Sequence, residues 1–307
     1  MNYTLHQLQV FLKITELKSI TKASEALFLS QPAVSIQLKK FQDQFSIPLT
    51  EVVGRQLYVT DFGEEIAEAA QKILNEVEAI NYKTLAFKGQ IAGRLKISVV
   101  STGKYVMPYF LSDFTNQNRG VDLVMDVTNK NSVVKSLENN EVDFSLVSVI
   151  PDQLNLNRVE LMENKLYLIG GTKEKFNRKV TKNKILESYP LLYREDGSAT
   201  RNAMETYVKN QKINNPKKME LTSNEALKQA VIAGLGYSIM PLIGIKNELK
   251  NGDLQIIPYK GLPIVTNWNL VWQKSKNLSP TALAYLDFLK SEKDRIISDS
   301  FGWYKNY

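Results

Sequence analysis

The sequence predicts an N-terminal winged helix-turn-helix, a long linking helix and a C-terminal α/β domain of two lobes. Three observations predict this fold class. Apolar residues recur with helical 4-3-4 spacing over 34–45, an amphipathic stretch continues over 61–87, and strands alternate with helices from residue 94 onward. At 307 residues the chain is long enough for several domains with their own cores. The expected domain limits are these: 1–60 for the head, 61–89 for the linking helix and 90–300 for the C-terminal domain, with lobe I at about 93–163 and 266–296 and lobe II at about 164–265.

Within the head, residues 3–17 and 19–27 are expected to be helices that pack beneath a further helix starting after Ser30. Ser30 suits the N-cap and Pro32 the first turn, where a missing N–H costs nothing. The apolar face of this helix is expected to be buried. Its other face carries small and polar side chains, which a DNA major groove accepts. The candidate DNA-contacting residues near or on this open face include Gln31, Ala33, Ser35 and Lys39.

The linking helix is expected from Asp61 to Phe87, with Thr60 as its N-cap and acidic residues in its first turns. Its apolar residues follow a spacing close to a coiled-coil seam: Phe62, Ile66, Ala69, Ile73, Val77 and Ile80. One reading is a helix packed only on its own head. We favour a dimerising helix, because two heads held a helical turn apart can read a near-palindromic site. The segment 88–93 is expected to break the helix and form a hinge.

From residue 94 the pattern predicts a mostly parallel, doubly wound arrangement that restarts near residue 165 and returns through 266–273. Two such wound sheets, the second inserted into the first, give two lobes with a cleft between them. This is the layout of periplasmic binding proteins. The final residues, FGWYKNY, fit no expected element.

Small molecules bind beyond the carboxyl ends of strands in such sheets, where helix N-termini point. Each serine or threonine there has a plain alternative role as a helix cap, but together they converge on one cleft. Hydroxyls combined with Lys104 and Arg201 favour a small anion such as a carboxylate, phosphate or sulfate. The candidate effector-binding residues are Ser101, Thr102, Thr128, Ser148, Ser198, Thr200 and Arg201.

Several classes of chemistry are excluded or disfavoured. The chain has no cysteine, so disulfides and thiolate chemistry are excluded. Its one histidine, His6, has no partner nearby in the sequence for catalysis or metal binding, and no Gly-rich phosphate loop with a GK[ST] ending occurs. No catalytic residue, metal site or cofactor is expected. The N-terminus lacks the features of an export signal and no apolar run approaches the ~18 residues that cross a bilayer, so a cytoplasmic protein without a membrane partner is expected.

The net charge of +7 does not by itself identify a DNA-binding protein. Residues 1–62 contain six Lys/Arg and five Asp/Glu, a net of +1, whereas residues 165–218 contain thirteen and five, a net of +8. The excess therefore lies mostly outside the helix-turn-helix. It fits a solvated lysine-rich surface, with an anionic ligand or an extra DNA contact as the alternative.

The head carries a specific resemblance. The run Ser19 to Leu27, Ser30-Gln31-Pro32-Ala33-Val34-Ser35, Pro48-Leu49 and Gly54-Arg55 followed by Thr60 resembles the DNA-binding head of LysR-type transcriptional regulators, and chain length and element order fit that family throughout. The resemblance implies that the start of the second helix touches bases or phosphates through Gln31, Pro32, Ala33 and Ser35. It also implies that the wing arginine, Arg55, enters the minor groove. Ile36 and Val52 stand where the family often has arginine. The run Ser101 to Tyr105 also resembles the branch that includes Calvin-cycle regulators.

Residues and resemblance together predict a homodimeric or homotetrameric transcription regulator that binds promoter DNA and senses a small anionic metabolite. RNA polymerase is a further candidate partner. Two other classes stay open: a solute-binding protein, which would need an export signal, and a small enzyme on the same scaffold, which would need a catalytic cluster.

Overall fold

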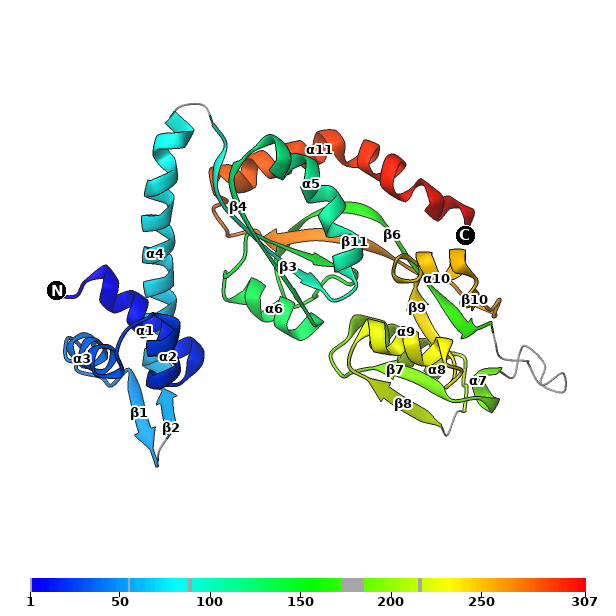
Figure 1. Cartoon of the computed structure of the whole chain (residues 1–307), viewed down its shortest axis with the longest axis horizontal. Coiled ribbons are helices and arrows are strands. Elements are labelled where there is room, and N and C mark those ends of the chain that lie inside the picture. Colours follow the sequence, from blue (N-terminus) through cyan, green and yellow to red (C-terminus); the bar gives the residue numbers. More distant parts are fainter. Residues whose placement is uncertain (1, 55, 88–89, 173–184, 215–216) are drawn as a thin grey trace. The chain divides into compact units, whose positions relative to one another are not determined.

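A computed structural model describes residues 2–54, 56–87, 90–172, 185–214 and 217–307 (Figure 1). The chain divides into two compact units, residues 1–90 and 91–307. Each unit has its own hydrophobic core, so the two are described in turn.

The head consists of helices followed by a β-hairpin. Val34, Leu38 and Phe41 are buried against the first helix, whose Phe11 and Ile14 are fully buried, and this accounts for the 4-3-4 apolar spacing. The hairpin strands pair antiparallel from Thr50 opposite Val59 to Val53 opposite Gln56. The elements are α1 (Leu5–Leu17), α2 (Ile20–Ala26), α3 (Gln31–Gln42), β1 (Thr50–Val53) and β2 (Gln56–Val59).

Helix α4 (Asp61–Phe87) starts on the head and extends beyond it. The Thr60 hydroxyl accepts a hydrogen bond from the Gly63 N–H at 3.0 Å and donates one to the Pro48 carbonyl at 2.7 Å, which ties the helix start to the hairpin. A Cβ at Gly63 would lie 2.1 Å from the Leu49 carbonyl oxygen, so only glycine permits this approach. Ala67 and Ala70 are buried, and α4 packs against α1.

The second unit begins with three parallel strands. β3 (Ala92–Val100) pairs with β4 (Gly120–Thr128) on one side and β5 (Phe144–Val147) on the other. The crossover helices are α5 (Met107–Gln117) and α6 (Lys130–Glu138). These strands, and the helices that cover them, form lobe I (Figure 1).

Two long antiparallel strands, β6 (Leu156–Gly171) and β11 (Ile264–Gln273), continue from lobe I into the other half of the unit, lobe II. Their pairing shifts register between Trp268 and Asn269. The sequence predicted a strand that starts near residue 165, but β6 starts nine residues earlier, at Leu156. The side chains over 156–163 are mostly part-exposed, so the segment lacks the continuous apolar run typical of a buried strand.

The expected second wound sheet is therefore small. Within the described residues β6 and β11 belong to one seven-stranded mixed sheet, of order β10-β6-β11-β5-β3-β4 with β9 also on β6, and a separate parallel pair is formed by β7 and β8. The remaining elements of lobe II are α7 (Ile185–Ser188), β7 (Leu191–Arg194), α8 (Ala199–Asn210), β8 (Lys218–Leu221), α9 (Asn224–Ile232), β9 (Ser238–Pro241), η3 (Leu242–Gly244), α10 (Lys246–Asn251) and β10 (Leu254–Ile256).

The C-terminal residues, which the sequence left unassigned, have a defined position. Helix α11 (Pro280–Phe301) packs against α5 and is followed by η4 (Gly302–Asn306). The buried Tyr304 hydroxyl accepts a hydrogen bond from the Lys165 N–H at 3.0 Å. The tail thus attaches to β6. In the part of the chain that is described, every helix is too short or too polar to span a bilayer.

Candidate functional sites in the head and between the lobes

The outer face of α3 is open to solvent. The Ser30 hydroxyl accepts a hydrogen bond from the Ala33 N–H at 3.3 Å and fixes the helix start. Val34, Leu38 and Phe41 of α3 are buried, whereas none of the expected DNA-contacting residues of this helix is buried. Ala33 is half-buried. The other four are exposed: Gln31, Pro32, Ser35 and Lys39.

Arg55, the expected minor-groove arginine, lies outside the described residues. Its neighbours form the tip of the β1–β2 hairpin. Gly54 there has a φ of +65°, a left-handed conformation that suits a tight turn. Val52 and Val53 are 68% and 63% exposed, so this hairpin presents apolar side chains where the family often has an arginine.

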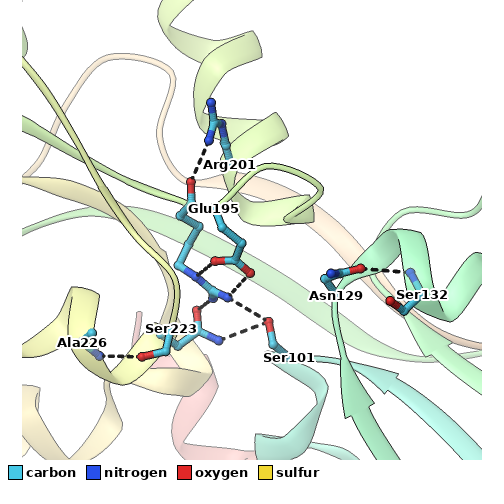
Figure 2. A network of polar contacts seen from close by, with 9 residues as sticks. Ser101, Asn129, Ser132, Glu195, Arg201, Ser223 and Ala226 are labelled. Atoms are coloured by element: carbon cyan, nitrogen blue, oxygen red, sulfur yellow. Dashed lines mark hydrogen bonds and ion pairs between the residues drawn. The ribbon is translucent and has the colours of Figure 1, made fainter. Parts of the chain in front are cut away.

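At the carboxyl edge of lobe I, three of the expected effector residues come together. Thr128 ends β4 and is paired with Val100, the residue before Ser101, and Ser148 directly follows β5 on the other side of β3. Asn129, next to Thr128, caps α6 by accepting a hydrogen bond from the Ser132 N–H at 2.9 Å (Figure 2). Parallel strands therefore bring these hydroxyls to one edge, as the sequence predicted.

Across from this edge, the end of β7 contributes a buried cation, Arg194, whose exposed fraction is 2%. Its Nη2 donates to the Ser101 hydroxyl at 3.3 Å and its Nη1 donates to the side-chain oxygen of Asn224. Asn224 itself donates to the Ser101 hydroxyl at 3.5 Å. In Figure 2, dashed lines at Ser101 of lobe I mark these two hydrogen bonds from lobe II. We call this junction the inter-lobe seam.

The charge of Arg194 is balanced by its neighbour in the chain. The two oxygens of Glu195 accept from Nε and Nη2 of Arg194 at 2.8 and 2.7 Å. Such a bidentate pair is the strong form of a charge-assisted hydrogen bond. Any incoming anion must therefore share Arg194 with Glu195 or displace it.

Arg201 does not join Ser101. Its Nε donates to Glu205 at 3.0 Å, and its Nη1 donates to Glu220 at 2.6 Å and to the backbone carbonyl of Arg194 at 3.2 Å. Hydrogen bonds to Glu220 and Glu205 raise the pKa of the Arg201 guanidinium. Arg201 thereby fixes the main chain that carries Arg194.

The loop after β7 approaches lobe I a second time. Gly197 has a φ of +80°, and a Cβ built on it would lie 2.9 Å from the side-chain nitrogen of Asn131 in α6. Both the conformation and the space favour glycine at this position. The segment from Arg194 to Ser198 thus faces the start of α6 as well as Ser101.

Hydroxyls near the seam are left with spare hydrogen-bonding capacity. Ser198 starts α8 but makes no side-chain cap hydrogen bond, and Thr102 makes none at the start of η1 (Gly103–Tyr105). Within the described residues, four of the expected effector residues are buried as a whole, yet their hydroxyl oxygens are not among the fully buried atoms that lack a partner: Thr102, Ser148, Ser198 and Thr200. Their side chains form no hydrogen bond within the described part of the chain, so these hydroxyls are available to a ligand.

Neither Arg194 nor Asn224 is among the effector-binding residues expected from the sequence. A signal for Arg194 exists, because a charged residue that ends an apolar strand lies at the edge of the sheet where ligands bind. No group of described His, Cys, Asp and Glu residues is arranged to hold a metal ion.

A solvent-facing helix-turn-helix, joined in one chain to a two-lobed domain with a polar seam, defines a DNA-binding regulator with a sensing domain. Comparison with known families supports this class. Residues 5–64 match the bacterial regulatory helix-turn-helix protein, lysR family, and residues 88–294 match the LysR substrate binding domain. The chain belongs to the LysR family of transcriptional regulators, and the expected fold class is confirmed. It is a regulator and not an enzyme.

Relatives agree with the expected branch. The chain is 34% identical to the HTH-type transcriptional activator CmpR of Synechocystis sp., over 96% of this chain and 97% of that protein. It is 34% identical to the RuBisCO operon transcriptional regulator of Allochromatium vinosum, over 96% and 98% of the two chains. A solved structure of the Synechocystis PCC6803 CcmR regulatory domain in complex with 2-PG matches with a TM-score of 0.60 and 29% identity, covering 65% of this chain and 97% of that one.

Proposed function

We propose that this chain binds promoter DNA as a homodimer or homotetramer in the cytoplasm and releases or repositions it when a small anion enters the inter-lobe seam. The observation that supports this most directly is the hydrogen bond from Arg194 to Ser101, which lies among hydroxyls without partners. The proposed target is a carbon-assimilation operon, since relatives are named for the RuBisCO operon. RNA polymerase remains a candidate partner.

The DNA-reading surface is the exposed face of α3. Gln31 and Ser35 can hydrogen-bond base edges, and Lys39 can pair with a phosphate. Pro32 and Ala33 permit close approach of the helix start to the duplex. Arg55 is proposed to enter the minor groove from the hairpin tip.

The oligomer is proposed to form through α4. Ile73 and Ile80 are 41% and 59% exposed although they lie in the apolar seam of a long helix. Exposed apolar residues at seven-residue spacing are typical of a helix that pairs with another helix. A twin head held in this way would let two α3 helices read neighbouring half-sites.

The effector is proposed to be a small anion that carries a carboxylate or phosphate. Arg194 supplies the cation, and the hydroxyls of Ser101, Thr102, Thr128, Ser148, Ser198 and Thr200 supply hydrogen bonds. Arg201 is proposed to act without touching the ligand, by holding the main chain that carries Arg194. Because Ser101 belongs to lobe I and Arg194 to lobe II, a ligand bound to both changes how the lobes are held together. That difference in affinity between two lobe arrangements is what an effector needs to alter DNA binding.

The proposed working parts follow the expected limits: 1–60 for DNA binding, 61–89 for dimerisation and 90–300 for effector binding, with lobe I at about 93–163 and 266–296 and lobe II at about 164–265. The head has a hydrophobic cluster of its own, to which the first turns of α4 contribute, and the second unit has separate clusters, which supports the division between DNA binding and effector binding.

The proposal is tested by calorimetric titration of the full chain with 2-PG, the ligand named for the CcmR structure, and with a neutral sugar as control. We expect saturable binding of the anion and none of the sugar. Binding of neutral sugars while 2-PG and every other carboxylate or phosphate tested fails would overturn the anionic effector.

A further inference from the structure

A cavity of about 410 Å³ is lined by residues other than those of the inter-lobe seam. Its walls come from η1, α5, α9, η3, α10 and the end of the chain at α11 and η4. Lys104, which the sequence suggested as a cation for the effector, lines this cavity, whereas Arg194 and the hydroxyls proposed to hold the effector do not. Its volume falls in the range of about 300–1,000 Å³ that is typical of small-molecule sites.

Aromatic rings form much of the wall. Tyr109 is 49% exposed and packs edge-to-face on Phe301, with ring centroids 5.1 Å apart. Tyr105 closes another side, and a Cβ on Gly244 would lie 3.1 Å from its ring, so the glycine lets the ring approach the main chain. Trp303, from the C-terminal residues, completes the aromatic part. Aromatic rings are common in the lining of sites for organic ligands, and in this cavity they lie beside charged side chains.

Two lysines in this wall lie over aromatic rings. The ammonium of Lys246 lies 4.9 Å from the ring centroid of Trp303, and that of Lys104 lies 5.1 Å from that of Tyr105. Neither lysine forms an ion pair within the described residues. Hydrogen bonding to Lys228 is the main cause that lowers the pKa of Glu225, and the nearby charge of Lys104 adds to it without forming an ion pair. A cation–π contact contributes only about 0.5–1 kcal/mol at an exposed site, so an anion would be a stronger partner for both.

The other charges of the wall are largely compensated. Lys228, whose side chain is 9% exposed, is held by Glu225 at 2.9 Å and by Glu248 at 2.8 Å. Burial lowers the pKa of Lys228, but the hydrogen bonds to Glu248 and Glu225 outweigh it and raise the pKa overall. Lys228 therefore stays charged and neutralises much of Glu248. Lys104 and Lys246 leave the cavity net positive.

We propose that this cavity is a second ligand site, for a small organic anion with an apolar body. The carboxylate or phosphate of the ligand lies between Lys104 and Lys246, and its body lies against Tyr109, Phe301 and Trp303. Lys104 belongs to lobe I, whereas Lys246 follows β9 of lobe II, so the ligand bridges the lobes at a place separate from Arg194. This site does not depend on the seam being the effector site.

The test uses the full chain labelled with 5-fluorotryptophan and fluorine-19 NMR. The chain has three tryptophans, and Trp303→Phe identifies the resonance of Trp303. Phenyl phosphate is expected to shift this resonance saturably and to leave that of the buried Trp268 in place. Inorganic phosphate lacks the aromatic ring and phenol lacks the phosphate group. Each is therefore expected to bind at least about tenfold more weakly than phenyl phosphate.

Matched variants locate the site. Lys246→Gln and Lys104→Gln are each expected to weaken phenyl phosphate binding about tenfold. Lys250→Gln, an exposed lysine of the same helix α10 that does not line the cavity, is expected to change nothing. Arg194→Lys, which alters the seam, is expected to leave the shift of Trp303 intact. The proposal is overturned if no saturable shift occurs, if Lys246→Gln and Lys250→Gln behave alike, or if Arg194→Lys alone abolishes the shift.

Discussion

The Nη2 atom of Arg194 lies 3.3 Å from the hydroxyl oxygen of Ser101, so a buried cation of lobe II reaches the first strand end of lobe I. This hydrogen bond joins the two lobes directly. Asn224 supports it by accepting from the same guanidinium and donating to the same hydroxyl. The guanidinium of Arg194 thus donates hydrogen bonds to three side chains, those of Ser101, Asn224 and Glu195.

Arg194→Lys is expected to weaken binding of 2-PG by about tenfold or more, because an ammonium cannot present the planar fork that serves these partners together. DNA affinity without effector is expected to stay within about twofold of wild type. Calorimetry and fluorescence anisotropy measure the two quantities. Arg119→Lys, at an exposed position, is the control. Equal effector affinity in both variants would remove Arg194 from the site.

Glu195→Gln is expected to strengthen binding of small anions, by up to about tenfold. Glu195 competes with the ligand for Arg194, and its amide analogue keeps the shape but not the charge. The same calorimetric titration measures this gain. Glu138→Gln on the exposed face of α6 controls for a general change of charge. Weaker binding in Glu195→Gln would mean that Glu195 helps the ligand instead.

Ser35→Ala and Lys39→Ala are expected to weaken binding to the DNA that flanks the protein's own coding sequence. Lys39→Ala should also reduce the dependence of log affinity on log salt by about one unit per protomer, because one phosphate contact is lost. Anisotropy titrations at several salt concentrations measure both effects. Lys72→Ala, an exposed lysine on α4, is expected to leave the salt slope unchanged. Identical slopes in all proteins would argue against α3 as the reading surface.

The paired change Ile73→Asp and Ile80→Asp is expected to break the oligomer, because two charges would enter an apolar helix seam. Sedimentation velocity should show smaller species, and DNA affinity should fall with them. Lys72→Asp, next to Ile73 but outside the seam, is the control. An unchanged sedimentation coefficient in the paired variant would show that α4 does not hold the protomers together.

Asp143 of lobe I makes the stability of the folded chain depend on pH. Burial raises the pKa of this carboxyl above 3.8, although the Lys96 N–H and Lys276 oppose the shift. Above about pH 4 the folded chain therefore binds more protons at this group than the unfolded chain, so its contribution to stability falls as pH rises through the folded pKa.

Asp143→Asn is expected to remove that contribution and to make the slope of the unfolding free energy against pH more positive, as pH rises from the ordinary pKa of an aspartate through the raised folded pKa. Urea unfolding at several pH values measures the slope. Asp152→Asn, at an exposed position, should leave it unchanged. A less positive slope in Asp143→Asn would contradict the assigned direction.

Much of the fold could be predicted from the sequence, because it follows from local patterns of residues. The spacing of Val34, Leu38 and Phe41 defines the buried face of α3, and α4 runs from Asp61 to Phe87 as expected. Thr128 and Ser148 reach one edge because strand order determines which ends meet.

The rest depended on contacts between distant residues. The sequence offered Arg201 as the cation of the site, but Glu205 and Glu220 bind it, and Glu220 lies on β8, a strand whose position no local pattern reveals. The hydrogen bond between Ser101 and Arg194 joins residues 93 positions apart. The long course of β6 was likewise missed, since its first half lies partly exposed.

The most direct test of the central claim is a hydroxyl-radical footprint of the full chain on the DNA flanking its own coding sequence, with and without 2-PG. We predict protection of two neighbouring half-sites about one helical turn apart, whose extent or spacing changes with 2-PG in wild type but not in Arg194→Lys. Protection of a single site, or a footprint that 2-PG changes equally in both proteins, would contradict a twin-headed regulator controlled through the inter-lobe seam.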